Sequence, residues 1–295
     1  MTGILLLDKA PGISSQRAVH EVQRLCGAAK AGHGGTLDPM AGGLLPILLG
    51  SATKLSRFLL EGDKGYRAEL LLGQVTDSYD TTGRVLERRP VAVTAEAFEQ
   101  ALAAFRGEIL QVPPMYSALS VDGERLYKLA RRGEQVERAA RPVTIHRLEL
   151  LLLEGERAVI EVDCSKGTYI RSLIHDLGAA LGCGACMSGL TRTMAAGFSL
   201  AQAHTVEALT QAAAQGALPD LLIRPEALFA QLPALSPAPF FCKLLRDGLR
   251  VLQRKLGSDI AAGGMARLYV DGEFFGLLGE GPADEGSALF LIWRA

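Results

Sequence analysis

The alternation of apolar and polar residues predicts strands in several parts of the chain. A strand is favoured where apolar side chains recur at every second position or form a short unbroken run. Ile160, Val162 and Cys164, for example, are two residues apart and would share one face of a strand. Asp271-Gly272 lies between two short apolar stretches and is typical of a hairpin turn. Before this turn, the stretches that predict strands are residues 3–7, 66–72, 143–153 and 158–164.

Helices are predicted where apolar residues are spaced three and four apart. Three of them would begin after residues that cap a helix well, namely Ser14 or Ser15, Thr94 and Thr205. Because helices and strands mix without a regular βα alternation, we expect an α+β fold with a mixed, mainly antiparallel sheet flanked by helices. The clearest helical stripe consists of Ile170, Leu173, Ile174, Leu177 and Leu181.

A cluster of three prolines interrupts the pattern near the C-terminus. Short strand-like stretches follow it, and Gly248 and Gly257 argue against one long helix there. We therefore predict a large domain at residues 1–232 and a small β-rich module at residues 233–295. The 295 residues suffice for two such units without a disulfide or a metal to stabilise them.

Composition narrows the class of protein. Hydrophobic residues make up 48% of the chain and charged residues 21%, which is typical of a globular protein. No apolar run approaches the ~20 residues that cross a bilayer, so no membrane segment is expected. No secretory leader is recognisable at the N-terminus. The odd number of cysteines, five, favours reduced thiols and a cytoplasmic protein.

Several familiar site motifs are missing from the sequence. It has no GxxxxGK[ST] phosphate-binding loop and no GxSxG nucleophile motif. Cys183 and Cys186 form a CxxC, but no second Cys or His pair lies at the spacing that a zinc site needs. We therefore interpret the two cysteines as packed thiols and predict no metal site.

Charge is distributed unevenly along the chain. The formal net charge of -1 does not by itself indicate a nucleic-acid-binding protein. Residues 125–147, however, contain seven Lys or Arg against two acidic residues, enough to neutralise several phosphates. A solvent-exposed face without a binding role is the alternative, and charge alone favours it. The basic residues are Arg125, Lys128, Arg131, Arg132, Arg138, Arg141 and Arg147.

Two segments carry candidate chemistry. Residues 31–43 are predicted to form a loop with five glycines, in which Asp38 follows His33 and precedes a proline. Glycines let a backbone approach a ligand closely, although an ordinary Asp-Pro turn is the alternative. In the second segment, Arg171 stands near the start of the predicted helix, where a cation is slightly unfavourable. A buried carboxylate partner would explain this placement better than exposure to solvent.

Over residues 3 to about 195, the chain resembles bacterial TruB-type tRNA pseudouridine synthases. The motifs of this family stand in the family's order, and so many matching blocks are highly specific. Residues 233–295 resemble a shortened PUA-type RNA-binding domain more weakly. The matching blocks are LLLDK and PG within 5–12, GHGGTLDPMAGGLLP at 32–46, KGYR at 64–67, LGQVTDSYDTTG at 72–83, PPMYSA at 113–118, CSKGTYIRSLIHDLG at 164–178 and LTR at 190–192.

The resemblance implies a pseudouridine-synthase fold and the isomerisation of uridine to pseudouridine at position 55 in the T-loop of tRNA. The C–N glycosidic bond breaks, the uracil rotates and a C–C bond forms, so no cofactor is expected. The target base must leave the helical stack and enter a pocket of the enzyme. The expected partner is the T-arm of tRNA, and we expect a monomer without an obligatory protein partner.

The resemblance also implies roles for individual residues. Asp38 aligns with the catalytic aspartate, which either attacks the ribose or the uracil ring as a nucleophile and holds a covalent intermediate or assists elimination of the base. Arg171 aligns with the arginine that pairs with this aspartate. Tyr66 aligns with the catalytic tyrosine that stacks on the flipped base and can act as a base on the sugar. The implied substrate-binding residues are His33, Tyr169, Leu190 and Lys9, and the implied contacts to the RNA backbone are Arg131, Arg132 and Arg138.

Three positions depart from the usual pattern of the family. Gly34 stands where the family usually has Thr, and we expect it to loosen the loop that holds His33. Asp163 stands where a neutral or basic residue is common, and Cys186 where a histidine can occur. None of the three is a group to which the resemblance assigns chemistry.

Two other functions stay open. A guide-RNA-dependent archaeal or eukaryotic relative shares the aspartate motif, but it would need protein partners and a full PUA domain. A tRNA-binding folding factor without catalytic activity is the second alternative. The joint presence of Asp38, Tyr66 and Arg171 favours an enzyme.

Overall fold

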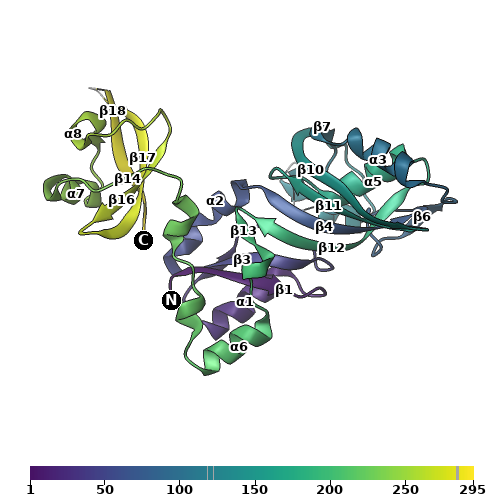
Figure 1. The fold of residues 1–295 in the computed structure, drawn as a ribbon, viewed down its shortest axis with the longest axis horizontal. Coiled ribbons are helices and arrows are strands. Elements are labelled where there is room, and N and C mark those ends of the chain that lie inside the picture. The colour runs from purple at the N-terminus through teal and green to yellow at the C-terminus, as the bar shows by residue number, and fades with distance from the viewer. Residues whose placement is uncertain (118, 122, 284–285) are drawn as a thin grey trace.

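The computed structural model describes residues 1–295 except 118, 122 and 284–285, and it describes residue 131 only by its backbone. The chain forms a large unit around a nine-stranded sheet and a small unit around a five-stranded sheet (Figure 1). Helices pack beside both sheets, which confirms the predicted α+β class.

Nine strands form the large sheet. They are β1 (Gly3–Lys9), β2 (Ala31–His33), β3 (Gly42–Leu49), β4 (Lys64–Leu72), β7 (Gly107–Gln111), β10 (Arg141–Glu154), β11 (Arg157–Cys164), β12 (Ala185–Ala195) and β13 (Phe198–Ser199). Seven of them follow the order β1-β3-β12-β4-β11-β10-β7, while β2 pairs with β3 and β13 with β12. Only β3 and β12 pair in parallel among these strands, so the mixed, mainly antiparallel sheet that we predicted is confirmed within the described residues.

Two features of this sheet differ from the prediction. The loop predicted at residues 31–43 is shorter, because its ends form β2 and the start of β3, which both lie in the sheet. The pattern of residues did not predict β12, whose alternation is interrupted by Gly189 and by two register shifts against β4. This strand lies between β3 and β4 and brings residues 190–192 beside the glycine loop.

The predicted helix starts are confirmed. α1 (Ser15–Leu25) is capped by Ser14 rather than Ser15, while Thr94 caps α3 (Ala95–Ala103) and Thr205 caps α6 (Val206–Ala214). The stripe that begins at Ile170 forms α5 (Ile170–Ala180). These four helices bury their apolar faces in one core that covers one face of the sheet. A second core lies under η1 (Gly50–Leu55) and α2 (Ser56–Glu61).

Further short elements connect these parts of the large unit. A two-stranded ribbon and a small hairpin precede β10, and single turns of helix follow β13. Their bounds are β5 (Gln74–Thr76), β6 (Val85–Arg88), β8 (Ser120–Val121), β9 (Glu124–Arg125), α4 (Leu126–Arg131), η2 (Leu200–Gln202), η3 (Leu218–Leu221) and η4 (Pro225–Phe229).

The small unit contains a five-stranded sheet of order β14-β16-β17-β18-β15 and two short helices. Their bounds are β14 (Ala234–Leu235), α7 (Pro239–Arg246), β15 (Val251–Leu252), α8 (Gln253–Leu256), β16 (Met265–Val270), β17 (Glu273–Ala283) and β18 (Gly286–Arg294). Asp271 and Gly272 both have positive φ between β16 and β17, so the predicted hairpin turn is confirmed. The two separate short helices confirm that no long helix forms among the described residues of this unit.

The two units are joined by an apolar contact. Trp293 of β18 belongs to a cluster with Phe229 of the large unit, and it donates a hydrogen bond from Nε1 to the carbonyl oxygen of Ser51. Leu55 and Leu277 are buried in the same cluster. The small unit therefore rests on the segment that leads into α2.

The cysteines and the helices agree with two further predictions. All five cysteines are free and buried, which confirms that Cys183 and Cys186 are packed thiols. Within the described part of the chain, no helix has the length and apolar character that crossing a membrane requires.

Candidate active site

Asp38 lies in the loop between β2 and β3, and this loop is held at several points. The hydroxyl of Ser15 accepts a hydrogen bond from the backbone N–H of Leu37 and donates one to its carbonyl oxygen. The N–H of Gly12 bonds to the carbonyl oxygen of Pro39 over 2.7 Å. Because Leu37 is buried and its neighbours are bonded, the carboxylate of Asp38 is presented in a defined position.

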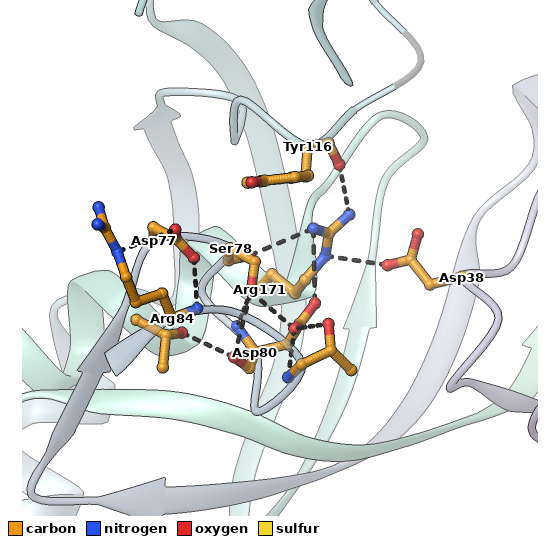
Figure 2. A network of polar contacts seen from close by, with 9 residues as sticks. Asp38, Asp77, Ser78, Asp80, Arg84, Tyr116 and Arg171 are labelled. Carbon is orange, nitrogen blue, oxygen red and sulfur yellow. Dashed lines mark hydrogen bonds and ion pairs between the residues drawn. The ribbon is translucent and has the colours of Figure 1, made fainter. Parts of the chain in front are cut away.

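Arg171 binds Asp38 through its guanidinium group (Figure 2). Its Nε lies 2.9 Å from Oδ2 of Asp38, and its side chain is only 8% exposed. Its Nη2 donates to the carbonyl oxygen of Tyr116 over 2.8 Å, and its Nη1 donates to that of Ser78 over 3.3 Å. The predicted carboxylate partner of Arg171 is thus confirmed, and the arginine is held on three sides.

A second carboxylate, Asp80, also faces Arg171 and was missed by sequence reasoning. Its Oδ2 lies 3.7 Å from Nη1 of Arg171. Its Oδ1 accepts hydrogen bonds from the hydroxyls of Ser78 and Thr82 and from the N–H of Thr82, at 2.6 to 2.9 Å (Figure 2). The signal in the sequence is the dense run of Asp, Ser and Thr at residues 76–82, which is typical of a turn that satisfies its own buried acid.

A cavity of about 480 Å³ opens beside these groups. It has the size of a site for a small molecule or a single nucleotide. Among the predicted site residues, Asp38, Tyr66, Tyr169, Arg171 and Leu190 line it together. The other lining residues are Gly35, Thr36, Leu37, Leu60, Lys64, Tyr116, Ser117, Tyr127, Ser165, Gly167, Thr168, Ile170 and Arg192.

Comparison with known proteins identifies the family. The description "TruB family pseudouridylate synthase (N terminal domain)" matches residues 23–170, and "tRNA pseudouridylate synthase B C-terminal domain" matches residues 171–227. A protein of Aromatoleum aromaticum named tRNA pseudouridine synthase B is 50% identical over 93% of this chain and 87% of its own length. The chain belongs to the TruB family.

Other relatives agree with this assignment. A tRNA pseudouridine synthase B of Ectopseudomonas mendocina is 57% identical over 72% of this chain and 70% of its own length. Among solved structures, a chain of "Crystal Structure of a Cbf5-Nop10-Gar1 Complex" is similar with a TM-score of 0.76 and 26% identity, over 99% of this chain and 84% of that chain. The expected pseudouridine-synthase fold is thus confirmed.

Two residues that the TruB resemblance assigns to substrate binding do not belong to the lining of the cavity. Lys9 is fully buried, and its Nζ donates to the carbonyl oxygens of Ala10 and Ile13 at 3.0 and 2.8 Å. His33 accepts a hydrogen bond at Nδ1 from the N–H of Gly35. Burial and the nearby cation Arg192 lower the pKa of His33, which favours the neutral ring.

The glycine at position 34 has a physical partner in α2. A Cβ atom at this position would lie 2.6 Å from Cδ1 and 2.7 Å from Cβ of Leu59, which is too close for any side chain. The N–H of Gly34 also bonds to the carbonyl oxygen of Pro46 over 2.9 Å. Leu59 therefore fills the space beside the loop, and we find a packed contact where we expected loosening.

In the folded protein, carboxylates contact two of the arginines in the basic segment at residues 125–147 and offset part of its charge. Arg132 forms ion pairs with Glu124 and Glu134, and Arg147 bonds to Glu149, Glu161 and Asp163. Arg138 donates from Nη1 to the carbonyl oxygen of Pro113, while its buried Nε has no partner within the described residues. The side chain of Arg131 lies outside the described part of the chain.

Burial and neighbouring charges oppose each other at Asp38. Burial raises the pKa of its carboxyl group and nearby Asp80 adds to the rise, while Arg171 and Lys9 lower it. The pKa remains above its ordinary value. A reaction that needs the ionised carboxylate will therefore lose rate as the pH falls through this raised pKa.

We expect Asp80→Asn to lower the single-turnover rate by about tenfold to a hundredfold. The amide keeps the size of the side chain but removes a charge 3.7 Å from Nη1 of the buried Arg171. The expected loss corresponds to about 1.4–2.7 kcal/mol of barrier, less than the cost of leaving a buried charge without any partner, because Arg171 keeps Asp38. Single-turnover kinetics at saturating tRNA measures the effect. Asp77→Asn is the matched control, because Asp77 lies in the same turn but bonds to Arg84 instead of Arg171. Equal rates for the wild type and Asp80→Asn would show that Asp80 only shapes the turn.

Proposed function

We propose that the protein isomerises uridine to pseudouridine at position 55 in the T-loop of tRNA. The observation that carries the proposal is the joint placement of Asp38, Arg171 and Tyr66 around one cavity in a member of the TruB family. Relatives at 50 to 57% identity bear the name tRNA pseudouridine synthase B.

In this proposal the flipped uridine occupies the cavity, with Asp38 as the nucleophile. Arg171 favours the ionised form of the carboxylate and fixes its direction, which counters the burial that would protonate it. Tyr66 stacks on the base, while Tyr169 and Leu190 contact the uracil ring from other walls of the cavity. His33 and Lys9 act from outside the cavity, by occupying the vacated place in the RNA and by holding the loop, respectively.

The reaction redistributes bonds within one nucleotide. The C–N glycosidic bond breaks, the detached uracil turns while it stays in the cavity, and a C–C bond forms to the same sugar. No atom is supplied from outside except protons, which solvent and side chains can exchange. The walls of the cavity would hold the detached base close to the sugar while it turns.

The function is tested by incubating the purified protein alone with an unmodified tRNA transcript and mapping pseudouridine at each nucleotide. We expect pseudouridine at position 55 and nowhere else. Product that forms only after a guide RNA and partner proteins are added would favour the guide-dependent alternative. Binding of tRNA without any product would favour a folding factor without catalytic activity.

We further propose that the protein works as a cytoplasmic monomer without an obligatory protein partner. Its five free, buried cysteines fit a reducing compartment. The solved relative at 26% identity is a chain of a complex with other proteins, whereas the relatives with twice that identity share the name of a single enzyme. The division into residues 1–232 for catalysis and 233–295 for RNA binding completes the proposal. Size-exclusion chromatography with light scattering tests the oligomeric state.

The basic segment at residues 125–147 is proposed to bind tRNA phosphates. Replacing Arg131, Arg132 and Arg138 by Ala is expected to weaken tRNA binding and to reduce its log–log salt slope by about one unit per lost phosphate contact. Arg132 can take part because its ion pairs are exposed, and such pairs cost little to exchange for a phosphate. The rate at saturating tRNA should stay nearly constant, since these residues would bind ground and transition states alike.

Filter binding at several salt concentrations measures both quantities. Arg147→Ala is the matched control, because Arg147 belongs to the same segment but already contacts three carboxylates. An unaltered affinity and an unaltered salt slope in the triple variant would support the alternative of a solvent-exposed face without a binding role.

A further inference from the structure

Arg192 is a buried cation that the proposed mechanism does not yet use. Its side chain is among the largest fully buried ones, with 1% of the residue exposed. It donates from Nε to the carbonyl oxygen of Leu44 over 2.7 Å and from Nη2 to that of Gly35 over 3.2 Å. Among the described residues no carboxylate forms an ion pair with it. Because an unpaired buried charge is costly, its retention beside a cavity calls for a functional explanation.

The register of the sheet places Arg192 directly beside Tyr66. The two residues are cross-strand partners on the antiparallel strands β12 and β4, so their side chains share one face. Both residues line the cavity that contains Asp38, and the nearby Arg192 lowers the pKa of Tyr66. On its other side Arg192 opposes Gly43 of β3, where a Cβ atom would lie 2.5 Å from the carbonyl oxygen of Arg192. The close approach of three strands therefore fixes the arginine against the tyrosine.

We propose that Arg192 is a positioning residue that directs the Tyr66 hydroxyl into the cavity and stabilises negative charge on its oxygen. The catalytic role of this contact rests on the proposed function. The guanidinium group has five N–H donors in a fixed plane, so it can anchor the carbonyls of Leu44 and Gly35 and still bind Tyr66. The same arginine thereby couples the position of the tyrosine to the loop that carries Asp38.

Conversion of uridine to pseudouridine supplies a reason for such a group. The uracil loses the hydrogen on C5, where the new bond to the sugar forms, and it gains one on N1, where the old bond was broken. One proton is thus removed and one is added, and the ring keeps its charge. A phenol that can release and take up a proton inside the cavity can assist this exchange, and a neighbouring cation makes it a better proton-transfer group.

The groups around Tyr66 shift the pKa of its phenol in opposite directions. Burial raises the pKa of Tyr66, and Cys164 on β11 and Asp38 in the loop raise it further, while Arg192 lowers it. The other cations of the cavity wall are Lys64 and Arg171, which contact backbone carbonyls or carboxylates. Arg192 lowers the pKa of Tyr66, so its removal should make the phenol less acidic.

The test measures the ionisation of Tyr66 without reference to activity. The six tyrosines are labelled with fluorotyrosine, whose phenol is more acidic, and titrated by fluorine NMR, with Tyr66→Phe used to assign the signal. We expect Arg192→Gln to move the titration of residue 66 upward by at least about one pH unit and Arg192→Lys to move it by less. Arg67→Gln is the matched control, because Arg67 is the next residue on β4 but is exposed on the opposite face.

Single-turnover kinetics tests whether the effect of Arg192 on Tyr66 matters for catalysis. In single-turnover assays, Arg192→Gln should displace the pH–rate profile toward higher pH, and this displacement should vanish in a Tyr66→Phe background. An unchanged titration of residue 66 in folded Arg192→Gln overturns the inference, and so does a rate loss of equal size at every pH. Circular dichroism identifies variants that do not fold, and Arg192→Lys then decides. If the wild type forms no pseudouridine, the proposed function fails while the titration still reports on the contact.

Discussion

Replacing Asp38 by Asn should abolish pseudouridine formation while tRNA affinity stays within a few-fold of the wild type. The amide has the shape of the carboxylate but cannot act as a nucleophile, and loss of a nucleophile typically costs about three or more orders of magnitude in rate. Binding should persist because the cavity wall and the basic segment are unchanged. Single-turnover assays with an unmodified transcript, together with filter binding, measure both quantities.

The fold of this variant should also persist. The side chain of Asp38 is 38% exposed, and Arg171 keeps Asp80 as a second carboxylate nearby. Asp63→Asn is the matched control, because Asp63 is an exposed acid near the start of β4 that faces His146 rather than Arg171. Substantial turnover by Asp38→Asn would remove Asp38 from the central role and would redirect attention to the remaining groups of the cavity.

Local elements were the part of the fold most accessible from the sequence. Ser14, Thr94 and Thr205 act as helix caps because one short side chain satisfies a backbone donor, a contact that depends on neighbouring residues alone. The turn at Asp271-Gly272 is local in the same way. β12 was not predictable in this manner, because Gly189 and two register shifts against β4 interrupt its alternation.

The residues of the site also differ in how far the sequence could identify them. Asp38, Tyr66, Tyr169, Arg171 and Leu190 could be named from the family motifs, and the structure brings all five to one cavity. Asp80 and Arg192 were not assigned a role, because their significance lies in what they face across the sheet and the turn. The charge of residues 125–147 also depends on the fold, because a count along the chain includes Arg147, whose carboxylate partners come from outside the segment.

Replacing Arg171 by Lys should lower the single-turnover rate by about 10²–10³-fold although the positive charge is kept. The guanidinium group reaches Asp38, Asp80 and the carbonyls of Ser78 and Tyr116 from one fixed plane (Figure 2). A lysine ends in a single ammonium group, which cannot span these four acceptors. The expected loss corresponds to about 3–4 kcal/mol of barrier, within the range for breaking a buried ion pair.

The pH–rate profile of Arg171→Lys is the most specific test of this prediction. Arg171 lowers the pKa of Asp38 against the effect of burial, so a weaker cation lets that pKa rise further. The acidic limb of the pH–rate profile should therefore move to higher pH in Arg171→Lys, and the rate should be recovered in part as the pH increases. Arg147→Lys is the matched control, since Arg147 also contacts three carboxylates but lies on the exposed face of the sheet. A lysine variant with nearly normal rates and an unmoved acidic limb would show that Arg171 contributes only its positive charge. The orientation of Asp38 would then be set by its loop alone.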